Sequence, residues 1–234
     1  MDICYLVPGI GLSSAEKARR EAVLNKIAAP GTTVRVCGVA DGPTSIENAA
    51  DEFKAMPNVL AYIVGHQNEF DAFILGCAGD TGLDGCREQS ARPVIGPGES
   101  SILLGTLGGK MFSMITISPE RARTKRRMVR DAGFSEHRIV SSHSLGIPVL
   151  ELPKDVARTK AALIGCLREA KAKGAEAMLL GCMSVAFMAP EVLASASQEA
   201  GLPLVNPIVS AVKMAEALVS MDQYGRDSQR AAAQ

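Results

Sequence analysis

Two cysteines occupy corresponding places in two similar stretches of the sequence. One stretch reads Phe73-Ile-Leu-Gly-Cys77-Ala-Gly-Asp80, and the other reads Met178-Leu-Leu-Gly-Cys182-Met-Ser-Val185. Each is a short apolar run that ends in Gly-Cys and is followed by helical spacing, so we expect each thiol where a buried strand meets a loop. A thiolate is a good base and nucleophile when a helix N-terminus or a positive charge activates it.

Two thiols that face each other could invert a carbon centre. One thiolate would remove a proton from carbon, and the other thiol would supply a proton to the opposite face. Loop amides after the two cysteines are candidates for stabilising the negative charge formed on the way. Neither Cys77 nor Cys182 has a histidine beside it in the sequence, so a Cys-His nucleophile gains no support. The alternative is that both are ordinary buried small residues, as we expect for Cys4, Cys37, Cys86 and Cys166.

The sequence after each Gly-Cys is also repeated. Pro93-Val-Ile-Gly-Pro97 follows Cys77, and Pro203-Leu-Val-Asn-Pro207 follows Cys182. Both copies predict a strand, Gly-Cys, a helix, a short strand flanked by proline, and another helix. Two copies so far apart indicate a domain duplication rather than a stacked repeat. Two similar halves facing each other would form a cleft with one cysteine on each wall.

Strands and helices are predicted to alternate along the chain. The predicted strands are Ile3–Val7, Thr32–Val39, Asp71–Leu75, Met111–Thr116, Ala177–Leu180 and a short strand-like segment at Ile147–Glu151. The helices between them include two at 45–53 and 58–68 and longer ones at 154–173 and 190–200. Such alternation predicts mostly parallel sheets with both faces covered. Ligands then bind outside the carboxyl ends of the strands, where Pro8, Cys77, Thr116 and Cys182 are expected.

The predicted helix after Ser118 is strongly basic. It carries Arg121, Arg123, Lys125, Arg126, Arg127 and Arg130. A nucleic-acid face would use interleaved aromatic residues for base stacking, and this run contains none. We interpret the run as a solvated helix surface and predict no nucleic-acid partner.

The composition excludes several other classes. The chain has 234 residues, of which 47% are hydrophobic and 21% charged, as in globular proteins. Lys plus Arg number 25 and Asp plus Glu number 25, so no net charge favours an acidic or basic partner. The N-terminus resembles no secretory signal and no apolar run is long enough to cross a bilayer, so we predict a cytoplasmic protein without a membrane partner.

No metal or cofactor site is predicted. The six cysteines form no Cys-x-x-Cys pair, and the three histidines lack tight metal-ligand spacing. The segment Gly9-Ile10-Gly11 approaches a dinucleotide-binding pattern, but Ser14 replaces its third glycine and the nearest acid, Asp41, comes about thirty residues on rather than about twenty. We therefore expect a small-molecule substrate and no cofactor.

At these residues the chain resembles the aspartate/glutamate/hydantoin racemase superfamily, and within it the hydantoin and allantoin racemases. Besides the two Gly-Cys motifs, the resemblance rests on Gly42-Pro43-Thr-Ser-Ile-Glu47, Asp80-Thr-Gly-Leu83, Gly146-Ile-Pro-Val-Leu-Glu-Leu152 and Ala211–Val219. It implies cofactor-independent racemisation with Cys77 and Cys182 as the catalytic acid/base pair. It also implies a homo-oligomer.

The resemblance implies a definite architecture. We expect two similar α/β domains with mostly parallel four-stranded sheets flanked by helices, related by a pseudo-twofold, with the active site in the cleft between them. The first domain is predicted to comprise residues 1–97 plus 205–234, because the C-terminal helix returns to it, and the second to comprise residues 98–204.

Departures from the family pattern affect the expected substrate. The usual Asn-Pro-Asn after the first strand is replaced by Val7-Pro8-Gly9-Ile10, Cys-Ala-Gly by Cys182-Met-Ser, and Thr-Thr by Thr116-Ile117. We therefore expect conserved chemistry on a substrate that differs from a standard hydantoin. The candidate substrate-binding residues are Pro8, Gly9, Asp80, Thr81, Thr116, Met183 and Ser184.

Two other functions remain open. Maleate isomerases and arylmalonate decarboxylases use a superfamily cysteine as nucleophile or proton donor. The presence of both cysteines weighs against the decarboxylase and leaves the isomerase open. The second alternative is a non-catalytic small-molecule-binding protein that kept the cleft.

Overall fold

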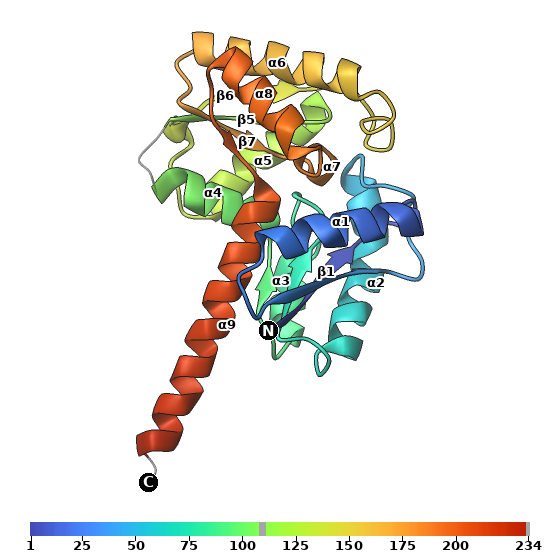
Figure 1. Ribbon diagram of the computed structural model, residues 1–234, viewed down its shortest axis with the longest axis vertical. Helices are drawn as coiled ribbons and strands as arrows, with labels where there is room; N and C mark the ends of the chain where they lie inside the picture. Colours follow the sequence, from blue (N-terminus) through green and yellow to red (C-terminus); the bar gives the residue numbers. More distant parts are fainter. Residues whose placement is uncertain (108–110, 233–234) are drawn as a thin grey trace.

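The structure is a computed structural model that describes residues 1–107 and 111–232, with side chains as far as Gln223. The chain forms two lobes, each built on one parallel sheet with helices around it (Figure 1). Residues 108–110 of the predicted second domain and 233–234 of the first lie outside the described residues.

The two sheets repeat one strand order. The first has the order β2-β1-β3-β4 and the second the order β6-β5-β7-β8, with every neighbouring pair parallel. The strands are β1 (Asp2–Val7), β2 (Thr33–Gly38), β3 (Ala72–Leu75), β4 (Val94–Ile95), β5 (Phe112–Thr116), β6 (Ile139–Ser144), β7 (Ala177–Leu180) and β8 (Leu204–Val205). This order confirms the predicted α/β duplication.

The central strands are buried because helices cover both faces of each sheet. All residues of β3, β5 and β7 are buried, which explains their nearly continuous apolar sequences. The helices are α1 (Ser14–Ile27), α2 (Ala49–His66), α3 (Leu83–Gln89), α4 (Pro97–Leu107), α5 (Pro119–Asp131), α6 (Val156–Ala172), α7 (Met183–Ala186), α8 (Pro190–Ala200) and α9 (Pro207–Ala232). None of the described helices has both the length and the apolarity needed to cross a membrane.

The C-terminal helix joins the two lobes. It starts after β8 of the second sheet, packs on α4 and contacts α1, β3 and β4 of the first lobe. Figure 1 shows its far end extending past the rest of the fold. Val205, which the predicted limits assign to the first domain, belongs to a strand of the second sheet.

Three predicted elements are wrong. The segment Ile147–Glu151 forms no strand. The edge strand of the second sheet is β6, which was not predicted. Four of the six residues of β6, Ile-Val-Ser-Ser-His-Ser, are polar, which hid the strand in the sequence. Two of these polar side chains are paired inside the protein: Ser141 Oγ lies 2.7 Å from both Ser113 Oγ and His143 Nε2. The helices predicted at 45–53 and 58–68 form one helix, α2, which contains Pro57 and begins after Asn48.

Candidate active site

Each Gly-Cys motif ends a buried central strand beside the neighbouring strand. The Gly76 amide donates to Leu6 O of β1, and the Gly181 amide donates to Ile115 O of β5, both at 2.7 Å. A Cβ at these glycines would lie 2.5 Å and 2.6 Å from the same oxygens, which no side chain tolerates. Glycine therefore lets the strand stay paired to its last residue, and the next residue, the cysteine, leaves the sheet at its carboxyl edge.

Both cysteines line one cavity between the lobes. Its volume is about 640 Å³, including space open to solvent. Segments of both halves form its wall: residues 7–9, 44–46 and 76–79 with Leu12 and Arg20 from the first, and residues 116–117, 149–150 and 181–184 with Arg121 from the second. The predicted site residues at this cavity are Pro8, Gly9, Cys77, Thr116, Cys182, Met183 and Ser184.

Asp80 and Thr81 do not line this cavity. The Asp80 carboxylate turns away and accepts hydrogen bonds from the amides of Gly98 at 2.8 Å and Glu99 at 2.7 Å, in the first turn of α4. Burial raises the pKa of Asp80 to about 6, against the lowering effects of Lys125 and these two amides. Asp80 therefore fixes the loop after Cys77 to α4 rather than facing the cavity.

Three loop segments of the cavity wall are joined to one another by hydrogen bonds. The Ile10 amide donates to Pro43 O at 3.0 Å, which packs the loop after β1 against residues 43–44. The Val149 amide of the second half then donates to Glu47 Oε1 of the first half at 3.0 Å. The segment expected as a strand is thus part of the cavity wall, held by a carboxylate from the other half.

A buried arginine holds the loop after Cys182. Arg20 on α1 is only 4% exposed and lies over the ring of Phe187, 4.7 Å from its centroid. Its Nε donates to Glu16 at 2.8 Å and its Nη2 to Ser184 Oγ at 3.2 Å. A cation of the first half therefore supports the cysteine loop of the second.

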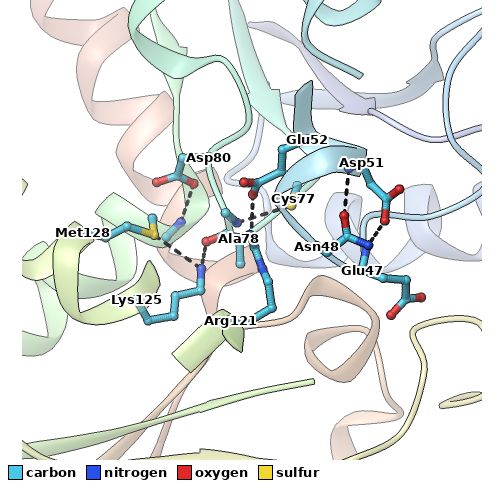
Figure 2. A network of polar contacts seen from close by, with 12 residues as sticks. Glu47, Asn48, Asp51, Glu52, Cys77, Ala78, Asp80, Arg121, Lys125 and Met128 are labelled. Carbon is cyan, nitrogen blue, oxygen red and sulfur yellow. Dashed lines mark hydrogen bonds and ion pairs between the residues drawn. The ribbon is translucent and has the colours of Figure 1, made fainter. Parts of the chain in front are cut away.

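The loop after Cys77, in the first half, is supported by cations of the second half. Lys125 on α5 of the second half is 1% exposed, and its ammonium donates to Ala78 O. Arg121, one turn earlier, is 5% exposed and its Nη2 lies 2.5 Å from Glu52 Oε1 of the first half. Figure 2 shows both side chains reaching from one helix to the segment at Cys77 and Ala78.

The interpretation of α5 as a solvated basic surface is therefore wrong for two of its six cations. Arg123, Arg127 and Arg130 are exposed, but Arg121 and Lys125 point inward. The sequence carried two signals for this placement. Arg121 and Lys125 share one helical face with the apolar Val129. Lys125 also follows the helix N-cap Ser118 at the same spacing at which the buried Arg20 follows the N-cap Ser13.

Burial raises the pKa of the Cys77 thiol, and the carboxylate of Glu52 raises it further. The Thr81 hydroxyl, the Gly79 amide at 3.3 Å from Sγ, and Lys125 act in the opposite direction by favouring the thiolate. The pKa is nevertheless above its ordinary value, so Cys77 is mainly a thiol at neutral pH.

The Cys182 thiol has the same character. Burial raises its pKa, while the amides of Val185 and Ser184 at the start of α7 oppose the shift. The charge of Cys77 raises the pKa of Cys182, since two neighbouring thiolates repel each other. The arrangement therefore favours one thiol and one thiolate over two thiolates.

In the part of the chain that the structure describes, no three His, Cys, Asp or Glu side chains are grouped so that they could hold a metal ion. The chemical groups at the cavity are two thiols, backbone amides, hydroxyls and two guanidinium groups. Such a set can transfer protons and can bind oxygen atoms of a ligand.

Comparisons with known proteins agree on one family. The model of the Asp/Glu/Hydantoin racemase family matches residues 13–215. A hydantoin racemase from Rhizobium meliloti is 33% identical over 221 residues, which cover 94% of this chain and 89% of that protein.

Solved structures share the fold. The allantoin racemase from Klebsiella pneumoniae has a TM-score of 0.83 and 29% identity, covering 94% of this chain and 88% of that chain. The maleate isomerase Iso from Pseudomonas putida S16 has a TM-score of 0.70 with 12% identity, covering 93% of this chain and 92% of that one. At this low identity the second likeness concerns the fold alone.

Proposed function

The chain belongs to the Asp/Glu/hydantoin racemase family and is an isomerase of the racemase type, and we propose that Cys77 and Cys182 are its acid/base pair. The observation that carries this proposal is that one cavity is lined by both cysteines, which come from opposite halves of the fold. A racemase needs one proton acceptor and one proton donor on the two faces of the reacting carbon.

In the proposed reaction one sulfur takes up a proton and the other gives one up, so no cofactor is needed. The thiolate of one cysteine takes the proton from the carbon next to a carbonyl, and the electrons of the broken C–H bond pass to the carbonyl oxygen as an enolate. The thiol of the other cysteine then gives its proton to the opposite face of that carbon, and the carbonyl forms again. The enzyme is left with thiol and thiolate exchanged, ready for the reverse direction.

We propose a substrate of the hydantoin or allantoin type, or a related amino-acid-like compound. The support is that a hydantoin racemase and an allantoin racemase are similar to this chain over most of its length. The cavity wall combines apolar side chains with hydroxyls and amides, which fits a small ring with carbonyl and N–H groups. The altered loop at Pro8 and Gly9 favours a substrate that binds there through backbone groups rather than through asparagine side chains.

The test is a screen for loss of optical rotation in heavy water. Single enantiomers of 5-substituted hydantoins, allantoin and amino acids are incubated with the protein, and deuterium at the reacting carbon is followed by NMR. We expect enzyme-dependent racemisation with deuterium uptake for at least one cyclic ureide. Stabilisation by these compounds without exchange or turnover would support the binding protein, and isomerisation of maleate through a covalent cysteine adduct would support the isomerase.

Lys125→Met should shift the pH dependence of the reaction. Lys125 lowers the pKa of Cys77, so its removal leaves less thiolate at a given pH. We expect kcat/KM at pH 7 to fall about tenfold for each unit by which the thiol pKa rises. The loss should shrink as the pH is raised, because the thiolate then forms without the ammonium.

The control for this variant is Lys26→Met, which removes an exposed lysine from the last turn of α1. Its pH profile should match that of the wild type. If Lys125→Met lowers kcat/KM equally at every pH, Lys125 serves only to hold Ala78, and its charge has no effect on Cys77.

A further inference from the structure

Arg121 is a buried cation with an unused hydrogen-bond donor. Its Nη2 is held by Glu52 at 2.5 Å, but Nη1 is buried and has no acceptor among the described residues. Buried polar groups nearly always have a partner, and an unpaired donor on a charged group is especially costly. Because Arg121 is also part of the cavity wall, a bound ligand could supply the missing acceptor.

The guanidinium lies next to the sulfur that we assign to proton transfer. Both groups surround Gly79: a Cβ at that position would collide with Arg121 Nη2 and lie 3.3 Å from Cys77 Sγ. Glu52 Oε1 is the atom nearest to that position, so the glycine leaves room for the Arg121–Glu52 ion pair directly beside Cys77. A carbon placed against Cys77 Sγ would have its neighbouring carbonyl within the reach of the guanidinium.

The local charges leave the guanidinium available to an incoming negative charge. Glu52 balances the charge of Arg121 through Nη2 alone. The other nearby carboxylate, Asp80, is engaged by the amides of Gly98 and Glu99. The donor at Nη1 thus faces no competing carboxylate oxygen in the described structure.

We propose that Arg121 Nη1 binds the carbonyl oxygen next to the reacting carbon and stabilises it as the enolate when Cys77 and that carbon exchange a proton. The inference rests on the proposed racemase function and adds to it the side chain that holds the carbonyl oxygen of the substrate. A charge-assisted hydrogen bond acts more strongly on an enolate than on a neutral carbonyl, so it lowers the barrier rather than only tightening binding.

Arg121→Ala tests the proposal with the most active compound of the panel. The loss of an oxyanion donor typically lowers kcat by about 100- to 1000-fold, so we expect a fall of that order with a much smaller change in KM. Deuterium uptake should fall in parallel. Added guanidinium ion should restore part of kcat, whereas urea at the same concentration, which carries no charge, should not. Arg123→Ala, an exposed arginine on the same helix, should retain wild-type kcat.

A second variant separates this role from the ion pair. Glu52→Gln removes the charge of the partner but leaves Arg121, so its kcat should exceed that of Arg121→Ala by at least about tenfold. Equal losses in both variants, or an Arg121→Ala protein with wild-type kcat, would overturn the inference while the racemase function stands. Absence of exchange in the wild type with every compound would instead overturn the proposed function.

Discussion

Cys77→Ser and Cys182→Ser are each expected to lower kcat for racemisation at pH 7 by about 10³-fold, within the 10²- to 10⁴-fold range of general acid–base catalysis. A serine hydroxyl keeps the size of the thiol but does not ionise in this pH range, so it can neither accept nor deliver the proton at a useful rate. Chiral chromatography of the product measures the effect. Because both sulfurs act in each turnover, the double variant should be little worse than either single variant.

Cys166→Ser is the matched control for the cysteine variants. Cys166 is a half-buried thiol on α6, and its Sγ lies 3.8 Å from Ser144 O, outside the cavity wall. Its replacement should leave kcat at the wild-type value. If one of the two active-site variants retains wild-type activity, only one thiol is needed, and a one-base reaction such as that of a nucleophilic isomerase becomes the better account.

Gly76→Ala and Gly181→Ala are expected to damage both stability and activity. The added methyl group would lie 2.5 Å from Leu6 O or 2.6 Å from Ile115 O, so the central strands must move apart. Overpacking of this kind costs about 2–3 kcal/mol, which corresponds to a Tm lower by roughly 5–10 °C. The following cysteine moves with the strand end, and a misplacement of that size lowers kcat by roughly 10- to 100-fold.

Gly165→Ala provides the opposite control. Gly165 is exposed in the middle of α6, and a Cβ there meets no atom within 4 Å. Alanine at this position should stabilise the protein by about 0.5–1 kcal/mol and leave kcat unchanged. Calorimetry and activity assays on the three variants compare the positions directly. Wild-type stability in Gly76→Ala and Gly181→Ala would show that the strand ends tolerate a side chain.

The fold could be predicted because its signals are local. Buried parallel strands have continuous apolar sequences, and the Gly-Cys pattern marks the ends of β3 and β7 because only glycine fits beside the carbonyl of the next strand. The strand β6 could not be recognised in this way. Its serines and histidine resemble a surface sequence. Only the structure shows that Ser141 is paired inside the protein, with Ser113 of β5 and with His143 of the same strand.

The candidate site was predicted less completely than the fold. The two cysteines, Pro8 and Thr116 were expected at the carboxyl ends of the strands, and all four line the cavity. The inward positions of Arg20, Arg121 and Lys125 were missed. Whether a charged residue of a helix points inward depends here on its partners in the other half of the fold. Asp80 follows Cys77 closely in the sequence, yet its backbone, with φ of 55°, turns its carboxylate toward α4 instead.

The distribution of deuterium between the two enantiomers at early conversion tests the two-thiol reaction most directly. A single enantiomer of the substrate is treated with the wild type in heavy water, and the two enantiomers are separated and analysed by mass spectrometry after a few per cent of reaction. Cys77 and Cys182 acting from opposite faces should give a product that carries deuterium and a remaining substrate that carries hydrogen, because the donor thiol has equilibrated with solvent. Deuterium in equal amounts in both enantiomers, or a product that retains the original hydrogen, would contradict proton transfer by two separate thiols.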